Sequence, residues 1–228
     1  MIDTADQLNE SFTGYEMDKA VIFDMDGVLS DSEWIYEKKI LQVLAEEGVT
    51  IKSEEINDLF GQNMLIICRE LKARYGLEKG AEEYAARIYA LRDEHIEQNG
   101  LYPMPGAVEF VRKLHDAGVP LAVASSANAA TIRANMERFG IADCFDYLVS
   151  GVDCAHGKPA PDIYLKAAAL LGKDPADCIV FEDSANGVAA AKGAGMYCYA
   201  FVSPGAVPQD VSPADEIIHS FPISESLR

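Results

Sequence analysis

The stretch VIFDMDGVLSDSE, residues 21–33, decides how this chain is interpreted. Its apolar run Val21–Phe23 is typical of a buried strand, and two carboxylates, Asp24 and Asp26, follow together with a turn glycine, Gly27. Two like charges at the end of a buried strand are costly unless a cation or a charged substrate compensates them. The stretch therefore predicts a functional site, and one that is assisted by a metal ion.

The composition of the chain limits its partners. With 228 residues, of which 49% are hydrophobic, the chain can form one large domain or a domain with a smaller one. Its net charge of −18 argues against binding to nucleic acid or to anionic membranes, because both need patches of Lys and Arg. We therefore expect neither as a partner.

The cysteines and the N-terminus favour a cytoplasmic protein, which we expect to be a monomer. No apolar run approaches the ~20 residues that a membrane span needs. The extension formed by residues 1–18 is acidic and polar, which is unlike a signal peptide. The cysteines form no C-x-x-C pair and are interpreted as reduced, mostly core residues: Cys68, Cys144, Cys154, Cys178 and Cys198.

Short apolar runs alternate with helical patterns from residue 105 onward. Strands are predicted at 119–125, 146–150, 178–183 and 196–201, in addition to 20–24. Helices are predicted at 105–118, 128–140, 161–172 and 184–195, each ending near a glycine. This alternation predicts an α/β fold, a Rossmann-like doubly wound parallel sheet with both faces covered.

Residues 31–102 show no strand pattern. Their apolar spacing predicts four amphipathic helices, at 33–48, 53–61, 64–76 and 79–100. We therefore expect an inserted all-α domain at 31–102, within a core domain made of 19–30 and 103–228. The exits around 27–31 and 102–106 are plausible hinges.

Chemically suggestive residues follow the predicted strands. The carboxyl ends of parallel strands meet at one edge of a sheet, where ligands bind. The residues expected there are Asp24, Asp26, Glu182, Asp183, Ser125, Ser126, Asn128 and Lys158.

This set of residues favours phosphoryl transfer. Carboxylate oxygens at this density suit Mg²⁺, a hard cation. Ser125 and the backbone N–H groups of the following helix suit a phosphate, and Lys158 adds a positive charge. Positioning and charge neutralisation are the means by which such a site transfers a phosphoryl group.

Four short motifs, in this order, resemble those of the haloacid dehalogenase superfamily: DMDG (24–27), SS (125–126), GKPAPD (157–162) and EDS (182–184). The helical insertion is similar to that superfamily's small cap. DMDGVLSDSE, GKPAPDIY and EDSANGV look most like its β-phosphoglucomutase-like sugar-phosphatase branch, over residues 19–219.

The resemblance implies roles for the reacting side chains. Asp24 would be the nucleophile that forms an aspartyl-phosphate, and Asp26 the general acid and then the base. Ser125 would hydrogen-bond the phosphoryl group, and Lys158 would orient Asp24 and neutralise phosphate. Ser126 and Asn128 are assigned either to phosphate contact or to capping the following helix.

The resemblance also implies a magnesium cofactor. Asp24, Asp183 and the backbone carbonyl of Asp26 would bind Mg²⁺, and Glu182 would ligate directly or through water. The expected substrate partner is a small phosphorylated metabolite.

Each motif also has a purely structural interpretation. DMDG could belong to a calcium loop, but the later acidic positions of an EF-hand are missing. EDS could be a helix N-cap on the surface, and GKPAPD could be only a proline-rich loop with a solvated Lys158. Four histidines, at 95, 115, 156 and 219, lack ligand spacing and are assigned to surface or loops.

Substrate contacts are expected from the inserted domain. Candidates are Glu33, Trp34 and Tyr36 on its first helix, and Gln62 and Asn63 on a loop. Trp34, the chain's only tryptophan, could stack on a sugar ring or pack in the helical core, and the sequence leaves both open.

The chain departs from the true mutases of this branch. Where they carry a cap histidine and basic residues, this chain has Tyr36, Phe60 and Met64. A mutase must hold a second phosphate in its cap, so hydrolysis of a sugar or polyol phosphate is preferred. The alternatives are a β-phosphoglucomutase-type phosphomutase and a non-catalytic binder of a phosphorylated metabolite.

Overall fold

The computed structural model describes residues 19–59, 64–203 and 209–221. The described chain forms two compact units. A core unit comprises residues 19–31, 102–203 and 210–221, and a helical unit comprises residues 32–59, 64–101 and 209. None of the described helices is both long enough and apolar enough to cross a membrane.

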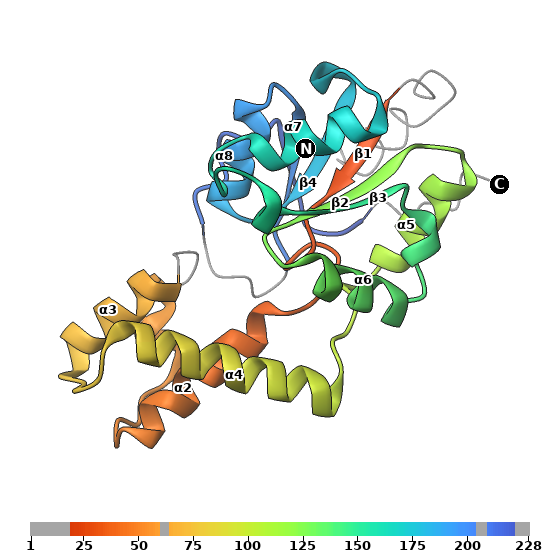
Figure 1. The fold of residues 1–228 in the computed structure, drawn as a ribbon. Helices are drawn as coiled ribbons and strands as arrows, with labels where there is room; N and C mark the ends of the chain where they lie inside the picture. Colours follow the sequence, from red (N-terminus) through yellow and green to blue (C-terminus); the bar gives the residue numbers. More distant parts are fainter. Residues whose placement is uncertain (1–18, 60–63, 204–208, 222–228) are drawn as a thin grey trace. The chain divides into compact units, whose positions relative to one another are not determined.

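The core unit is built on a six-stranded sheet with the order β3-β2-β1-β4-β5-β6 (Figure 1). All neighbouring strands are parallel. The strands are β1 (Ala20–Phe23), β2 (Leu121–Ser125), β3 (Tyr147–Ser150), β4 (Cys178–Glu182), β5 (Tyr197–Phe201) and β6 (Glu216–Ile218). The prediction of a parallel α/β sheet is confirmed, and β1, which precedes Asp24, lies between β2 and β4.

Strand β6 was not predicted from the sequence. It has only three residues, lies at the edge of the sheet and is partly exposed, so its sequence EII gives no alternation to detect. The β-bridge partners Tyr199 and Glu216 fix its register against β5.

Helices cover both faces of the sheet, as the doubly wound prediction requires (Figure 1). They are α5 (Ala107–Asp116), α6 (Ala129–Arg138), α7 (Asp162–Leu171) and α8 (Ala185–Gly193), with short 3₁₀ turns at Ala142–Cys144, Gly151–Asp153 and Pro175–Asp177. On one face, Ile22 packs with Tyr164 of α7 and Val188 of α8. On the other, Phe23 stacks on Phe181 and meets Phe110 of α5 edge to face. Each of the four helices is followed by a glycine with positive φ, as predicted.

The helical unit consists of α2 (Glu33–Glu46), η1 (Ser53–Leu59), α3 (Met64–Tyr75) and α4 (Ala81–Asn99). Its apolar core joins α2, α3 and α4 through residues such as Leu44, Cys68 and Ile88. The second predicted helix is a 3₁₀ helix rather than an α-helix. Ile56 and Leu59, which are buried among its described side chains, are three apart, a spacing that the three-residue 3₁₀ turn places on one side.

The chain leaves and re-enters the core unit at adjacent points. The Asp31 N–H donates to the Tyr102 carbonyl at 3.0 Å, and the Met104 N–H donates to the Leu29 carbonyl at 2.9 Å. Ser30 also forms an isolated antiparallel bridge with Pro103. The loop after β1 is thereby fixed at its far end by the returning chain.

Candidate active site

The turn after β1 places its carboxylates by means of a glycine. Asp24 is buried, and its N–H donates to the Phe181 carbonyl of β4 at 2.9 Å. Gly27 has φ +78°, a conformation that favours glycine, and a Cβ there would overlap the carboxylate of Asp183. Gly27 therefore lets the first loop approach the end of β4 closely.

Glu182, the last residue of β4, is fully surrounded by donors. Its Oε1 accepts hydrogen bonds from Lys158 Nζ at 2.6 Å and from the Tyr164 hydroxyl at 3.0 Å. Its Oε2 accepts from the N–H groups of Asp183 and Ser184, both at 2.8 Å, and from the Ser184 hydroxyl at 3.0 Å. The Ser184 hydroxyl accepts from the Gly187 N–H and so caps α8. The cap interpretation of EDS thus applies to Ser184, while Glu182 is buried inside the core unit.

Lys158 connects the ends of three strands. Its Nζ lies 2.5 Å from Asp24 Oδ1 and 2.6 Å from Glu182 Oε1, and it donates to the Ala124 carbonyl of β2 at 3.3 Å. Its side chain is only 8% exposed. Lys158 is therefore a buried ion-pair partner, and the interpretation as a solvated loop lysine is wrong.

The two carboxylates beside Lys158 differ in their acidity. Burial raises the pKa of Asp24 to about 7, against the attraction of Lys158 and with help from the negative charge of Glu182. Burial also opposes ionisation of Glu182, but Lys158 and the Ser184 donors outweigh it and lower its pKa. For Lys158, the two carboxylates outweigh burial and hold its pKa well above the usual value. One ammonium therefore contacts two carboxyl groups whose pKa values are shifted in opposite directions.

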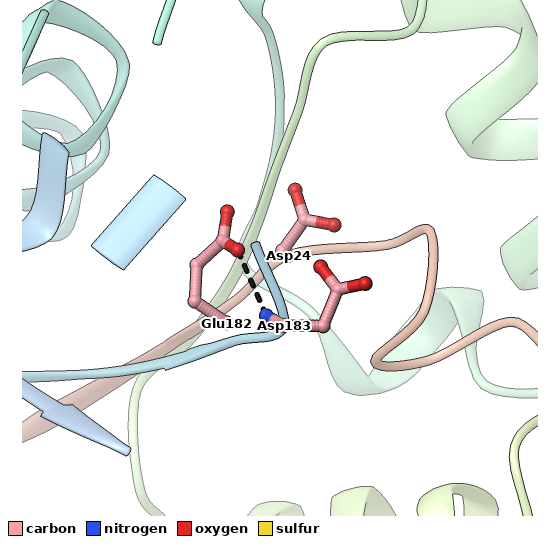
Figure 2. Close-up of side chains that lie close together, drawn as sticks. All are labelled: Asp24, Glu182 and Asp183. Carbon is pink, nitrogen blue, oxygen red and sulfur yellow. Dashed lines mark hydrogen bonds between the residues drawn. The ribbon is translucent and has the colours of Figure 1, made fainter. Parts of the chain in front are cut away.

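A cluster of carboxylates that could hold a cation lies where β1 and β4 end. Asp24, Glu182 and Asp183 each offer a carboxylate oxygen, and these oxygens all lie within 4.8 Å of one another (Figure 2). Burial keeps the pKa of Asp24 raised even beside Lys158, and three carboxyl groups gather near this ammonium. A hard divalent cation with oxygen ligands fits both the donor set and the charge deficit.

Ser125 ends β2, and Ser126 and Asn128 lie between this strand and α6. The Ser125 side chain is buried, and its hydroxyl accepts from the Ala127 N–H at 3.1 Å. Asn128 accepts from the Thr131 N–H at 2.9 Å, so it is the N-cap of α6. Ser126 is exposed. Of the two roles left open for Asn128, the structure shows helix capping.

The candidate residues of the helical unit are partly described. Trp34 is half-buried on α2, with the His95 ring edge-on at 5.4 Å and Lys38 Nζ 4.5 Å from its ring centroid. Tyr36 contacts Tyr89 edge to face, and its hydroxyl accepts a hydrogen bond from Arg92. The side chain of Glu33 and the residues Gln62 and Asn63 lie outside the described residues.

Sequence reasoning missed three residues. The sequence pattern predicts that Tyr164 is an ordinary apolar position of α7 and that Gly187 is a helix residue without a function. Arg92 reads as one of the charges on the outer face of α4, yet its side chain is only 20% exposed. The one available signal was the tyrosine after GKPAPDI, which places a hydroxyl at a buried helix position.

His156, two residues before Lys158, has its partner outside the carboxylate cluster. Its Nδ1 lies 3.1 Å from the Asp162 carboxylate, and its side chain is 75% exposed. It therefore belongs to the surface of the loop, as expected.

The chain is similar in sequence to proteins named as phosphatases, in agreement with the resemblance of its four motifs. The chain is 33% identical to hexitol phosphatase B of Escherichia coli K12, over 82% of this chain and 85% of that protein. It is 31% identical to a bifunctional riboflavin kinase/FMN phosphatase of Arabidopsis thaliana, and 36% identical to the Arabidopsis protein SUPPRESSOR OF QUENCHING 1. These matches cover 90% and 79% of this chain, which spans only 54% and 17% of those two longer relatives.

Solved structures share the fold. A haloacid dehalogenase family hydrolase from Deinococcus radiodurans, with bound phosphate and sodium, superposes with a TM-score of 0.75 at 28% identity, covering 89% of this chain and 91% of that one. CbbY from Rhodobacter sphaeroides in complex with phosphate gives a TM-score of 0.69 at 26% identity, covering 90% and 95%. The model of the haloacid dehalogenase-like hydrolases matches residues 19–195. The chain therefore belongs to the haloacid dehalogenase-like hydrolase family, and the prediction of a hydrolase of this superfamily is confirmed.

Proposed function

We propose that this protein is a Mg²⁺-dependent phosphatase that hydrolyses a small phosphomonoester through an aspartyl-phosphate on Asp24. The observation that carries the proposal is the buried Lys158, which lies 2.5 Å from Asp24 at the ends of the central strands. Hexitol phosphatase B and FMN phosphatase, to which the chain is similar, support the reaction class.

Asp24 is the proposed nucleophile. Its Oδ1 is held by Lys158, so the carboxylate is fixed in one orientation before a phosphate arrives. The same ammonium attracts the phosphate and reduces the repulsion between two anions as the oxygen–phosphorus bond forms. The leaving oxygen then departs as the phosphoryl group passes to Asp24.

Asp26 is the proposed acid and base. It donates a proton to the leaving oxygen in the first step, and it removes a proton from the water that hydrolyses the aspartyl-phosphate in the second. The Ser30 hydroxyl lies 3.4 Å from Asp26 Oδ1 and donates to the Met25 carbonyl, so it supports the turn that carries Asp26.

The proposed cofactor is held by Asp24, Asp183 and the backbone carbonyl of Asp26. Glu182, whose oxygens both accept several hydrogen bonds from the chain, is assigned an indirect contact through water. When bound, Mg²⁺ supplies positive charge that orients the phosphate and lowers the cost of ionising Asp24. Ser125, at the end of β2, is the proposed phosphate contact, and Ser126 is assigned with it.

The substrate class is proposed to be a sugar or polyol phosphate. The name of hexitol phosphatase B supports this choice. We further propose that residues 31–102 act as a cap domain and that Trp34 and Tyr36 contribute to substrate selection. A cytoplasmic location is proposed because all five cysteines are free, as in reducing compartments.

Phosphate release from a panel of sugar and polyol phosphates, with and without Mg²⁺, tests the proposal. Wild-type protein is expected to release phosphate only with Mg²⁺, and Asp24→Asn is expected to lose turnover because its amide is not a nucleophile. Asp143→Asn, which makes the same chemical change at an exposed position, is expected to keep wild-type activity. Equal activity of Asp24→Asn and wild type would disprove the proposed nucleophile.

Arg92 is the observation that favours the alternative, a phosphomutase. It places a largely buried cation beside Tyr36, the position at which the mutases carry a histidine. Incubation with β-glucose 1-phosphate and a bisphosphate activator distinguishes the two reactions. Formation of glucose 6-phosphate would support the mutase, and release of inorganic phosphate alone supports the phosphatase.

A further inference from the structure

Tyr164 is a buried tyrosine beside the site that the proposed reaction does not use. It lies in the first turn of α7, six positions after Lys158, and it is fully buried. Its hydroxyl donates to Glu182 Oε1 at 3.0 Å, the oxygen that Lys158 also contacts. One carboxylate oxygen therefore receives both the ammonium and the phenol.

The ring of Tyr164 also faces the lysine. Lys158 Nζ lies 4.9 Å from the ring centroid, within the range of a cation–π interaction. The ammonium thus has oxygens of Asp24, Glu182 and Ala124 as acceptors, and an aromatic ring as a further contact. The tyrosine restrains Lys158 twice, directly through the ring and indirectly through Glu182.

Gly187 provides independent support for a fixed position of Glu182. A Cβ at Gly187 would overlap the Glu182 carboxylate, so the first turn of α8 accepts this side chain only because a glycine faces it. The Gly187 N–H donates to the Ser184 hydroxyl, which in turn donates to Glu182 Oε2. Both oxygens of Glu182 are therefore fixed, one by α7 and one by the start of α8.

We propose that Tyr164 is a positioning residue for the reaction: its hydroxyl fixes Glu182, and Glu182 and the tyrosine ring together hold Lys158 against Asp24. This inference rests on the proposed function, in which Lys158 orients the nucleophile. Tyr164 itself touches none of the reacting groups, so its effect is exerted through the position of the ammonium.

The kinetic test compares Tyr164→Phe with Tyr197→Phe, using p-nitrophenyl phosphate with Mg²⁺. Both variants lose a tyrosine–glutamate hydrogen bond, because Tyr197 donates to Glu216 Oε1 at 2.6 Å on β5, outside the site. Tyr164→Phe is expected to lower kcat about tenfold, with a smaller change in KM. Tyr197→Phe is expected to keep the wild-type kcat. Equal kcat values for Tyr164→Phe and wild type would overturn the inference.

Crystal structures of the variants test the inference even if the protein shows no turnover of the substrate. In a crystal structure of Tyr164→Phe, we expect Lys158 Nζ to leave Asp24 or to occupy two positions, while Tyr197→Phe leaves it in place. An unchanged Lys158 in Tyr164→Phe would contradict the inference. Absence of Mg²⁺-dependent turnover in the wild type would instead disprove the proposed function, and the crystal structures would still decide the role of Tyr164.

A second pair of variants tests the Glu182 side of the arrangement. Gly187→Ala and Gly193→Ala both introduce a better helix former into α8, but at Gly193 the nearest atom to a new Cβ is Pro161 Cβ at 3.8 Å, an ordinary contact. Gly187→Ala is expected to lower kcat at least as much as Tyr164→Phe, and Gly193→Ala to leave it unchanged. Wild-type kcat in Gly187→Ala would show that the position of Glu182 is unimportant.

Discussion

Asp24 illustrates a conflict between stability and chemistry at the scale of one residue. Its carboxylate is buried beside the ionised Glu182, and the Lys158 ammonium contacts both. The pKa of Asp24, raised to about 7 mainly by burial, expresses the cost of ionising it without a metal ion. The same cost makes the site receptive to a divalent cation.

The raised pKa gives a pH-dependent stability prediction for metal-free protein. Between pH 3.8 and about 7 the folded state holds a proton on Asp24 that the unfolded state has released, so this group's contribution to stability falls as pH rises. Asp24→Asn, which stays neutral, is therefore expected to melt about 3–6 °C higher than wild type near pH 8 in EDTA. Near pH 5 the difference should be clearly smaller, and it should vanish only below pH 3.8, where the unfolded chain is also protonated at this position.

Thermal melts across this pH range, with and without Mg²⁺, provide the measurement. Mg²⁺ is expected to raise the melting temperature of the wild type more than that of Asp24→Asn, because the variant lacks one of the ligands. If Asp24→Asn melted at a higher temperature than wild type only at acidic pH, the pH dependence would have the opposite sign to the one expected. Burial of the Asp24 carboxylate would then be refuted as its cause.

At the scale of an element, β6 depends on a side chain more than on its own sequence. Asp215, just before the strand, accepts hydrogen bonds from the Cys198 N–H at 2.7 Å and from Lys192 Nζ at 2.6 Å. It therefore ties the start of β6 to β5 and to α8. Burial opposes ionisation of Asp215, but these two donors outweigh it and lower its pKa.

Removal of this carboxylate should weaken the edge of the sheet. Asp215→Ala is expected to reduce the free energy of unfolding by about 1–2 kcal/mol, because the Cys198 N–H loses its acceptor. Urea denaturation measures the change. Asp210→Ala is the matched control, since Asp210 is exposed and accepts hydrogen bonds from the nearby exposed Ser212, and it should have the smaller effect. An equal loss in both variants would show that Asp215 does not anchor β6.

At the scale of the whole molecule, every side chain proposed for the chemical steps belongs to the core unit. Asp24, Lys158 and Asp183 all lie within it, and the chain leaves and returns through Asp31 and Tyr102, which share a backbone hydrogen bond of 3.0 Å. The helical unit has its own apolar core. Folding of the core unit and its proposed metal site should therefore survive without the insertion.

This expectation is tested by replacing residues 32–101 with a short Gly/Ser linker. The adjacent exits mean that few linker residues can close the gap, at a small entropic cost. The shortened protein should unfold cooperatively and should still melt at a higher temperature when Mg²⁺ is added, in parallel with the full chain. Loss of cooperative unfolding would show that the core depends on the insertion.

The order of the elements and the location of the site could be predicted from the sequence. Apolar runs mark strands because buried strands exclude polar side chains, and the glycines after the helices mark chain reversals. The parallel arrangement then brings the strand ends together, so Asp24, Lys158 and Asp183 could be assigned to one edge. The short edge strand β6 escaped prediction, and the segment predicted as a helix at 53–61 forms a 3₁₀ helix over Ser53–Leu59 instead, because each has too few apolar positions to establish a period.

Only the tertiary structure decided which side chains form ion pairs and which of them contact the same cation. The contact of Lys158 with Asp24 joins residues 134 positions apart, and that of Arg92 with Tyr36 joins residues 56 apart. Local pattern reports whether a side chain is buried, but not which other buried group it meets. Acidity, ion pairing and the space beside Gly187 depend on atoms from several distant segments, and these meet only in the folded chain.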